Sequence, residues 1–422
     1  MLLRFQVSNH RSILDPVELS MIAVDDDRPA TRGFERLSER VLTTSGIYGP
    51  NASGKSNVLD ALYWLSYAVA TSLLGGGDSM PRDPHRFGKG SEKPSTFDMD
   101  CIVEGIRHGY QLEVDDSAVL YESLCSYPEQ RRRMLFEREG DEVHFRRGLS
   151  GAGGTRELLT PTTLVLSAAT RVGDPAIEVV GRAISRIAEI NSHGFNRGRR
   201  SSPFLFLARS SNTYSMFEDA GSREEQVFED MTRGEAAMEL LRLADPGIKD
   251  FDIVELKDHA TGATGEQLLF VHHDGDRPVN FWPKEESAGT RMLFSLLGPA
   301  LDALKYGQVL LFDEADASLH PRLSARLVEL FQDPRSNPRG AQLILATHDT
   351  SLLSVLNRDE VWFTEKWSDG ATRLVALAEF GGDQVRRSLN LERAYLQGRF
   401  GAIPEADHVD VLRALGLAGE AS

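Results

Sequence analysis

The sequence predicts an α/β protein whose core is a parallel sheet covered by helices on both faces. In the last third of the chain, short and almost wholly apolar strands alternate with segments of helical spacing, as expected for strands buried on both faces. Nearer the N-terminus, a glycine-rich loop stands between a strand-like run and a helix, the order that places a phosphate group at such a sheet. We expect one body over residues 1–422, interrupted by an antiparallel β arm and a helical insert.

The first lobe is expected to span residues 1–74. Alternating runs predict strands in its first half, and apolar residues spaced by three and four predict a helix after the glycine-rich loop. The glycines at 75–77 end that helix. The predicted elements are strands at 2–7 and 17–24, a run at 41–48 that leads into the loop, and a helix through 59–69.

Three further segments follow the first lobe. Short alternating stretches predict the antiparallel β arm over 96–147, and helical spacing at 177–190 and 224–243 predicts a mainly helical insert over 160–250. Residues 251–422 alternate between strand and helix and end in a C-terminal tail. The elements expected there are strands at 252–256, 267–272, 308–312, 342–346 and 360–364 and helices at 289–304 and 322–332.

The composition is that of an ordinary globular protein, with 41% hydrophobic and 26% charged residues and a net charge of −16. So acidic a chain is not a simple coat for nucleic acid, although a local basic patch is compatible with it. Its two cysteines, Cys101 and Cys125, form neither a zinc spacing nor a disulfide framework, which fits a reducing compartment. No secretory signal or membrane-spanning run is recognisable, so we expect a cytoplasmic protein without membrane contact.

The strongest local signal is the pattern Gly-x4-Gly-Lys-Ser between a strand and a helix. Glycines let backbone N–H groups turn inward around a phosphate, and the helix that follows presents its positive end to the anion. A lysine at this spacing reaches the β- and γ-phosphates, and the serine hydroxyl binds Mg²⁺. The residues expected to bind the nucleotide phosphates are Gly49, Pro50, Asn51, Ala52, Ser53, Gly54, Lys55, Ser56 and Asn57.

A second signal is an apolar run from Val309 that ends in two acids, Asp313 and Glu314. The pattern predicts a buried strand whose tip emerges at the site. There, Asp313 and Ser56 would hold Mg²⁺ and its waters, and Glu314 would orient or deprotonate the attacking water. Taken alone, the run fits a core strand with a solvated acidic end, but the phosphate loop in the same predicted sheet favours the catalytic interpretation.

Two weaker signals concern a helix start and a strand end. Glu286 to Thr290 opens a helix, where the Ser287 hydroxyl and the Gly289 backbone form either a second anion site or an ordinary helix cap. His348 follows a buried strand and is either a sensor of the γ-phosphate or a hydrogen-bonded histidine at a strand end.

The motifs, in the order in which they follow one another along the chain, resemble those of ABC-type ATPases of the RecF, SMC and OLD class rather than those of transporter cassettes. The opening residues 9–13 resemble the Asn-Phe-Arg-Ser-Phe of that class. Segments at 337–344, 358–363 and 395–404 resemble more narrowly the stand-alone AAA-type, OLD-related ATPases of bacteria, the RloA-like group. The motifs that support the class are Asn51 to Asn57, Ser287 to Gly289, Asp313 with Glu314, Ser318 to Pro321 and Thr347 to Asp349.

The resemblance implies a P-loop ABC-ATPase head that binds ATP and Mg²⁺ and closes as an ATP sandwich in a homodimer or higher oligomer. The set that one subunit would contribute is Lys55, Ser56, Asp313, Glu314 and His348, and the set that would face it from another subunit is Ser287 and Gly289.

The resemblance also implies that Arg11 binds the nucleotide and that Asp316 and Ser318 lie at the dimer seam. In this class a glutamine joins the two lobes of the head. Neither Gln111 nor Gln130 has the context of that residue, so its role is left unassigned.

Several functions fit these motifs. The favoured one is an ATP-dependent switch that controls a nucleic-acid-directed partner, such as a separately encoded nuclease, in phage defence or restriction. The alternatives are a nucleotide-gated scaffold with little turnover and an ATPase of DNA repair or maintenance. A nuclease within the chain is disfavoured, because no Asp-x-Asp pair follows His348, and Asp407 and Asp410 have the wrong spacing for a two-metal site.

Two segments allow opposing interpretations. Residues 131–210 hold fourteen Arg and no Lys against two Asp and six Glu, so they form either a face for DNA or RNA phosphates or a solvated surface of ion pairs. The clearest cluster there is Arg197, Arg199 and Arg200. The tail at 395–404 is either folded back on the body or free to dock a partner.

Overall fold

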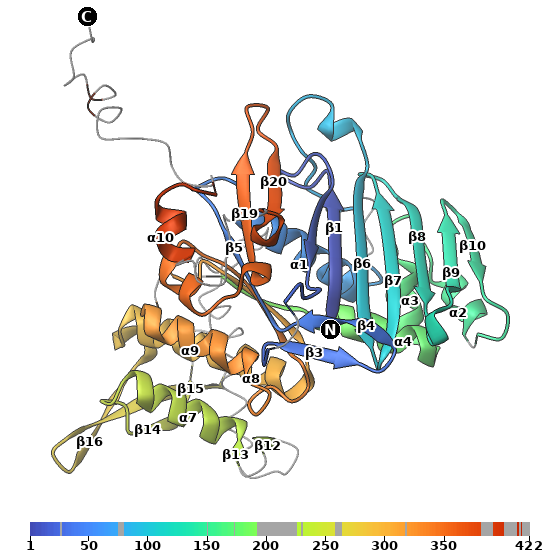
Figure 1. The fold of residues 1–422 in the computed structure, drawn as a ribbon. Coiled ribbons are helices and arrows are strands. Elements are labelled where there is room, and N and C mark those ends of the chain that lie inside the picture. Colours follow the sequence, from blue (N-terminus) through green and yellow to red (C-terminus); the bar gives the residue numbers. More distant parts are fainter. Residues whose placement is uncertain are drawn as a thin grey trace, which may run out of the picture.

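A six-stranded sheet forms the centre of the molecule, in the order β11-β17-β18-β5-β19-β20 (Figure 1). Neighbouring strands are parallel except in the β19–β20 hairpin. The strands are β11 (Ala188–Asn191), β17 (Val309–Asp313), β18 (Gln342–Ala346), β5 (Thr44–Tyr48), β19 (Val361–Lys366) and β20 (Thr372–Ala376).

The computed structural model describes residues 1–25, 28–74, 80–149, 151–172, 174–191, 226–228, 231–257, 264–316, 319–380 and 391–400, together with 412 and 415.

The two faces of this sheet bury two separate apolar clusters. Successive side chains of a strand point to opposite faces. Leu311 therefore joins the cluster around α1 (Lys55–Thr71), and Leu310 joins the cluster around α8 (Ala288–Tyr306) and α9 (Pro321–Gln332). The predicted parallel sheet, with apolar strands covered by helices on both faces, is confirmed.

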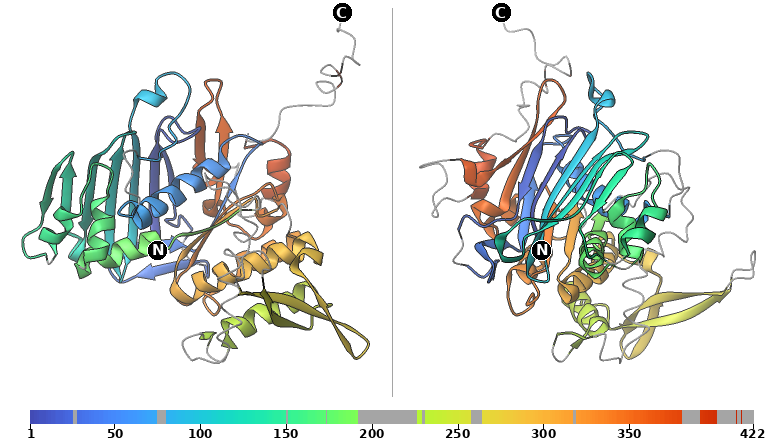
Figure 2. Two further views of the ribbon diagram at one scale, coloured as in Figure 1. Left: turned by 180° about the vertical axis from the view of Figure 1, so that it is seen from behind. Right: turned by 90° about the vertical axis from the view of Figure 1, so that its right-hand side faces the viewer.

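A seven-stranded antiparallel sheet shares helix α1 with the central sheet, in the order β10-β9-β8-β7-β6-β1-β2. The α1 cluster includes Phe5 of β1 and Phe97 of β6 as well as Leu311 of the central sheet. Figure 2 shows α1 together with α3 and α4 on one side of the two sheets. The strands are β1 (Leu2–Ser8), β2 (Val17–Ser20), β6 (Ser95–Val103), β7 (Ile106–Val114), β8 (Val119–Ser126), β9 (Arg133–Glu139) and β10 (Glu142–Phe145).

Smaller elements complete this part of the molecule. Strands of the segment predicted as a β arm pair directly with β1, so they belong to the same sheet as the N-terminus. The remaining elements here are the hairpin β3 (Thr31–Phe34) and β4 (Leu37–Leu42) and the helices α2 (Ala152–Glu157), α3 (Val165–Val172) and α4 (Pro175–Ser185). The short strands β12 (Gln226–Phe228) and β13 (Met231–Thr232) lie instead beside α8 and α7 (Arg233–Ala244).

The helix expected over 177–190 is wrong at its C-terminal end. α4 begins after Asp174, whose carboxylate accepts a hydrogen bond from the N–H of Ala176, but it ends at Ser185. Residues 188–191 form β11, which pairs in parallel with β17. Pairing of this edge strand with β17 outweighs the helical spacing that Ile190 shares with α4.

A three-stranded sheet and α7 (Arg233–Ala244) pack against α8. The helix expected over 224–243 begins only at Arg233, because Thr232 and Glu235 form a reciprocal capping box there. Phe270 meets Phe294 of α8 edge to face, with ring centroids 5.2 Å apart. Of the helices in the described ranges, none combines the length and apolar character needed to cross a bilayer. The sheet consists of β14 (Asp250–Lys257), β15 (Thr264–Asp274) and β16 (Arg277–Phe281).

The described part of the C-terminal segment packs on the central sheet. Tyr395 of α10 (Leu391–Leu396) stacks on Phe363 of β19, with ring centroids 5.5 Å apart and planes 3° from parallel. Phe400 stacks on the same ring at 5.6 Å and is 2% exposed. The Thr350 hydroxyl donates to the Glu392 carboxylate at 3.1 Å. These contacts favour the folded-back interpretation for residues 391–400, while 401–404 lie outside the described residues.

Phe400→Ala is expected to lower the free energy of unfolding by about 3–5 kcal/mol, because a buried aromatic ring leaves a cavity between Phe363 and Phe380. Leu396→Ala is the matched control, since Leu396 is 62% exposed and should change stability by less than about 0.5 kcal/mol. Chemical denaturation of both variants measures the difference. Equal stability of the two would show that the aromatic stack does not hold the tail.

The described arginines of the segment 131–210 lie in separate environments. Arg138 is 2% exposed and donates to the backbone carbonyls of Gly140, Thr160 and Thr163, so it is a structural residue. Arg182 pairs with Glu178 within α4. The exposed arginines of the segment also include Arg131, Arg132, Arg133, Arg146, Arg147, Arg171 and Arg186. The cluster Arg197, Arg199 and Arg200 lies outside the described residues.

Candidate functional site

The glycine-rich loop leaves the carboxyl end of β5 and enters α1. Gly49 and Gly54 have φ angles of 152° and 109°, in the region that favours glycine. Side chains of the β19–β20 hairpin also exclude a larger residue. A Cβ atom at Gly49 would lie 2.4 Å from the Thr364 hydroxyl, and one at Gly54 would lie 2.1 Å from the Thr372 hydroxyl. Both glycines of the motif are therefore required by the backbone and by its neighbours.

The same two threonines hold the loop in place. The Thr364 hydroxyl donates to the carbonyl of Tyr48 at 3.2 Å and lies 2.6 Å from the hydroxyl of Ser53. The Thr372 hydroxyl donates to the carbonyl of Ser53 at 2.8 Å and lies 2.7 Å from the hydroxyl of Ser12, to which Asn57 donates. The sequence analysis missed both threonines, since a threonine on a short strand has no motif around it.

Lys55 turns its ammonium group into the loop. Its Nζ atom donates to the carbonyls of Gly49 at 3.0 Å and Pro50 at 3.2 Å, and lies 2.9 Å from Nε2 of His348. Burial lowers the pKa of Lys55, and the negative charges of Asp316, Asp313 and Glu314 oppose that shift. An ammonium group has no acceptor, so Nε2 of His348 accepts this hydrogen bond and its imidazole is neutral.

His348 therefore lies at the loop as a neutral imidazole. Burial and the positive charge of Lys55 lower the pKa of His348. The backbone around it is fixed by Asp316, whose carboxylate accepts from the N–H of His348 at 3.0 Å and from the hydroxyl of Thr347 at 2.7 Å. The role of Asp316 at a dimer seam remains a prediction, and Ser318, the other predicted seam residue, lies outside the described residues.

Asp313 and Ser56 face each other across the start of α1. The Ser56 hydroxyl donates to the Asp313 carboxylate at 2.9 Å. Burial raises the pKa of Asp313, against the hydrogen bond from Ser56. A carboxylate and a hydroxyl are hard oxygen donors that fit Mg²⁺, which takes few protein ligands and completes its shell with waters and phosphate oxygens. Among the described residues there is no cluster of three His, Cys, Asp or Glu side chains that could hold a metal ion.

Glu314 follows Asp313 where β17 ends, with a φ angle of 55°. This backbone conformation is uncommon for a residue other than glycine and turns the chain sharply after the strand. The carboxyl ends of β5, β17 and β18 thus bring together Lys55, Ser56, Asp313, Glu314 and His348 from three separate parts of the sequence.

Arg11 lies on the flank of α1. Its Nε atom is 3.0 Å from the Asp60 carboxylate and 3.3 Å from that of Asp83. The buried His10 ring is 2.7 Å from Asp60 through its Nε2 atom. These contacts attach the loop after β1 to the phosphate-loop helix, and within the described residues Arg11 forms no hydrogen bond or ion pair with the phosphate loop itself.

Ser287 caps α8 and is an exposed residue. Its Oγ accepts from the N–H of Thr290 at 3.1 Å and lies 2.8 Å from the Thr290 hydroxyl, which donates to Asp245 at 3.2 Å. The preceding residue, Glu286, is buried, and its carboxylate lies 2.7 Å from Nε2 of His272 on β15. The three-stranded sheet and the end of α7 therefore position this motif, and the sequence analysis missed His272 and Asp245.

Within the described residues, neither candidate for the lobe-joining glutamine forms a hydrogen bond with the residues of the phosphate loop or with Asp313. Gln111 lies on β7 and donates to Asp98, and Gln130 lies in a short 3-10 helix between β8 and β9. The strand next to β17 in the central sheet is β11, and its last residue, Asn191, is in register with Asp313.

The fold and these groups define a P-loop nucleotide-binding domain of the ATPase type. A family model described as "AAA domain, putative AbiEii toxin, Type IV TA system" matches residues 45–354. The chain belongs to this AAA family. No curated protein matches the sequence.

Among solved structures, the chain is similar to three SMC heads. One is an SMC head bound to the C-winged helix domain of ScpA, with 13% identity, a TM-score of 0.45 and coverage of 89% of this chain and 97% of that one. The head domain from Thermotoga maritima has 13% identity, a TM-score of 0.38 and coverage of 89% and 98%. An SMC head with an extended coiled coil, bound to the C-terminal domain of ScpA derived from Pyrococcus furiosus, has 14% identity, a TM-score of 0.40 and coverage of 90% and 97%.

Proposed function

We propose that the protein binds ATP with Mg²⁺ and hydrolyses it in a composite site formed by two copies of the chain. The observation that supports this most directly is the meeting of Lys55, Ser56, Asp313, Glu314 and His348 at one edge of the central sheet. Parallel α/β sheets bind their ligands at this edge, beyond the carboxyl ends of the strands.

The residues would act as follows. The backbone N–H groups of the loop and the start of α1 would surround the phosphates, and Lys55 would exchange its bonds to Gly49 and Pro50 for phosphate oxygens. Ser56 and Asp313 would hold Mg²⁺, which neutralises charge on the phosphate oxygens when it is bound. Glu314 would accept a hydrogen bond from the attacking water, and His348, released from Lys55, would lie beside the γ-phosphate.

The second copy would supply Ser287 and Gly289. Ser287 is exposed while its neighbours Glu286 and Thr290 are buried, so the motif is rigidly held and open to a partner subunit. Binding of ATP would then join two subunits, and hydrolysis would separate them. This cycle would act as a switch on a separately encoded, nucleic-acid-directed effector such as a nuclease. The family description, which names an AbiEii toxin, and the resemblance to ATPases of restriction and phage-defence loci support a role in defence.

Purified protein is expected to release phosphate from ATP in the presence of Mg²⁺, and Lys55→Ala is expected to weaken ATP binding by at least ~10²-fold, because a charged phosphate contact is lost. Isothermal titration with ATP and a phosphate-release assay measure the two quantities. Lys89→Ala, at an exposed lysine on the same chain, is the control. Tight ATP binding without any turnover by the unmodified protein would favour the nucleotide-gated scaffold instead.

A further inference from the structure

A hydrogen bond connects the C-terminal segment to the chain beside the candidate ATP site. The Thr350 hydroxyl donates to the Glu392 carboxylate of α10 at 3.1 Å, and Thr350 is two residues from His348. The two partners are 42 residues apart in the sequence, so the bond belongs to the tertiary fold rather than to a local turn. It connects α10, which carries none of the nucleotide-binding motifs, to the segment that carries His348.

The same helix packs on the strand that leads into the phosphate loop. Tyr395 meets Tyr48, the last residue of β5, edge to face, with ring centroids 6.0 Å apart. It also stacks on Phe363, the residue before Thr364. Figure 1 shows α10 beside β5 and β19. All three rings are buried, so this packing fixes the position of α10 and, with it, of Glu392.

The segment around His348 is held from two sides. Asp316, which follows β17, accepts from the N–H of His348 at 3.0 Å. On the far side of His348, Thr350 donates to Glu392. Between them, the Asp349 carboxylate caps the short 3-10 helix η5 (Thr350–Ser354). His348 therefore lies between a group fixed by the central sheet and a group on the C-terminal helix.

These contacts bear on a geometry that tolerates little movement. Nε2 of His348 lies 2.9 Å from Nζ of Lys55, and hydrogen bonds of this kind weaken beyond ~3.2 Å. His348 is an exposed residue, so its position depends on the backbone contacts around it more than on packing of its ring. In an active site, displacement of a group by about 1 Å can cost ~10²-fold in rate. A contact that fixes residues 347–350 therefore affects the ATP site directly.

We propose that Glu392 is a positioning residue that, through Thr350, holds His348 at the phosphate loop beside Lys55. This role rests on the proposed ATPase function and deepens it, because it makes the C-terminal segment part of the control of the site. Tyr395 keeps α10, and therefore Glu392, in place. Displacement of α10 would release His348 without touching a residue that binds the nucleotide, so turnover could be controlled from outside the ATP site.

The test compares two substitutions of Thr350 in the full-length protein. Thr350→Val removes the hydroxyl donor and keeps the branched shape, whereas Thr350→Ser keeps the donor. Thr350→Val is expected to lower kcat for ATP at least ~10-fold and to change KM less than ~2-fold, because Lys55 and its loop are intact. Thr350→Ser should retain normal turnover. Glu392→Ala should reproduce the loss, and the double variant should be no slower than either single variant, because both substitutions break the same bond.

A measurement without nucleotide separates this role from the ATPase activity itself. Burial and the positive charge of Lys55 lower the pKa of His348, against the negative charges of Asp316 and Glu314. In Thr350→Val the ring is expected to be less buried and farther from Lys55, so the pKa of His348 should rise toward its ordinary value. NMR titration of the histidine signals, assigned with a His348→Gln variant, measures this change.

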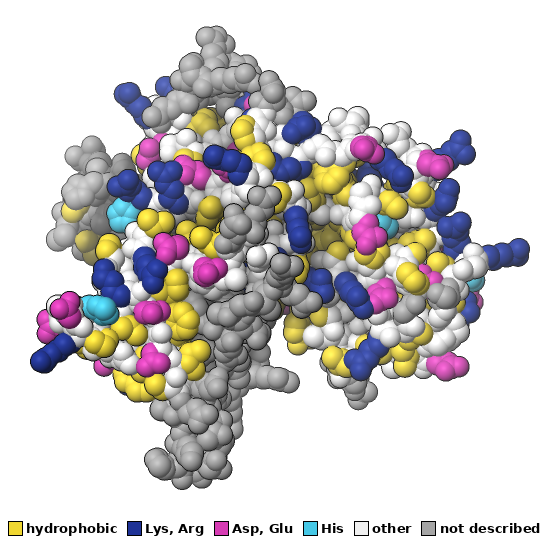
Figure 3. Space-filling view, turned by 90° about the horizontal axis from the view of Figure 1, so that it is seen from below, with side chains coloured by type: hydrophobic (Ala, Val, Ile, Leu, Met, Phe, Trp, Pro, Cys, Tyr) yellow, Lys and Arg dark blue, Asp and Glu magenta, His cyan; other side chains and the backbone are white. Residues whose placement is uncertain are grey.

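Other charges do not provide the same change in pKa. Thr350→Val alters no charged group, and salt screens charges that are more than about 8 Å away. On the face of the molecule shown in Figure 3, Lys and Arg side chains are interspersed with Asp and Glu side chains, so neither sign dominates there.

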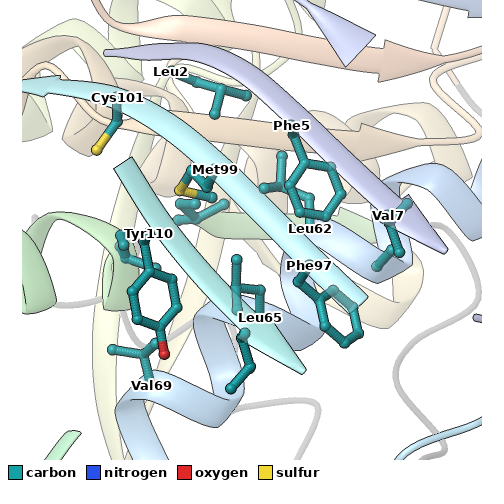
Figure 4. Packing of buried hydrophobic residues seen from close by; sticks show 14 of the residues in the cluster. Leu2, Phe5, Val7, Leu62, Leu65, Val69, Phe97, Met99, Cys101 and Tyr110 are labelled. Carbon is teal, nitrogen blue, oxygen red and sulfur yellow. The ribbon is translucent and has the colours of Figure 1, made fainter. Parts of the chain in front are cut away.

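Tyr121→Phe is the matched control, because it also removes a hydroxyl that donates to a carboxylate, that of Glu137 at 3.0 Å. Tyr121 lies on β8 of the antiparallel sheet, which packs on α1 through residues such as Phe97 and Tyr110 (Figure 4). Tyr395 of α10 belongs to the other apolar cluster. Turnover and the pKa of His348 should therefore be unchanged in this control.

Normal turnover together with an unchanged pKa of His348 in folded Thr350→Val would overturn the proposal. Equal losses in Thr350→Val and Thr350→Ser would also overturn it, because the serine keeps the hydrogen bond. Melting temperatures check folding, and Glu392→Ala replaces Thr350→Val if that variant is unfolded. If the unmodified protein released no phosphate from ATP, the proposed ATPase function would fail, and the pKa of His348 would still decide whether Glu392 positions it.

Discussion

Glu314→Gln is expected to slow ATP hydrolysis at least ~10²-fold while leaving the affinity for ATP unchanged, because the amide keeps the shape of the side chain but cannot take a proton from water. Asp313 and Ser56 keep their 2.9 Å hydrogen bond in this variant, so the group predicted to hold Mg²⁺ is retained. ATP should remain bound, and the two-subunit state should accumulate. Single-turnover phosphate release and light scattering with ATP measure these effects.

The control for this variant is Glu329→Gln on α9. Glu329 forms an ion pair with Arg326 on the surface of that helix, and such pairs contribute little to stability. Its turnover should equal that of the unmodified protein. If Glu314→Gln hydrolysed ATP at the normal rate, the general base would have to be another residue, and the assignment of Glu314 would be withdrawn.

The parts of the fold that could be predicted are those whose signal is local. The phosphate loop, α1 and the apolar strands β17 and β18 each follow from a short run of residues, because glycine conformation and burial on both faces of a sheet constrain every position. Lys55 follows β5 and Asp313 ends β17, and the two residues are close because both strands end at the same edge of the sheet, which the strand–helix alternation predicts. Their functional roles remain predictions.

The parts that could not be predicted depend on contacts between distant segments. Thr364 reaches Ser53 across 311 residues, and Thr372 reaches the carbonyl of Ser53 across 319. Strand β11 is set by pairing with β17, and no pattern in residues 188–191 outweighs the helical spacing before it. Likewise, the contact between His272 and Glu286 joins a hairpin to the start of a helix, and neither residue type predicts that contact from the sequence.

The composite site makes a second prediction of large effect, which concerns Ser287. Ser287→Arg places a bulky cation on an exposed helix start that is proposed to meet the γ-phosphate of the opposing subunit. The variant should bind ATP through its own intact loop and lose turnover at least ~10²-fold. Thr232→Arg, which removes the cap of α7 in the same way, is the control for lost capping, since caps contribute about 1 kcal/mol each.

Mixing Ser287→Arg with Lys55→Ala distinguishes action between subunits from action within one. In a mixed dimer, one site combines both defects, and the other combines the intact loop of the Ser287→Arg subunit with the intact helix start of the Lys55→Ala subunit. Random pairing makes half of the dimers mixed, so about a quarter of the sites should work. Each variant alone should be inactive, and equal amounts together should recover turnover up to about that fraction. If two folded variants exchange subunits and recover none, Ser287 acts on its own chain or on none, because only a site shared between subunits can be rebuilt by mixing.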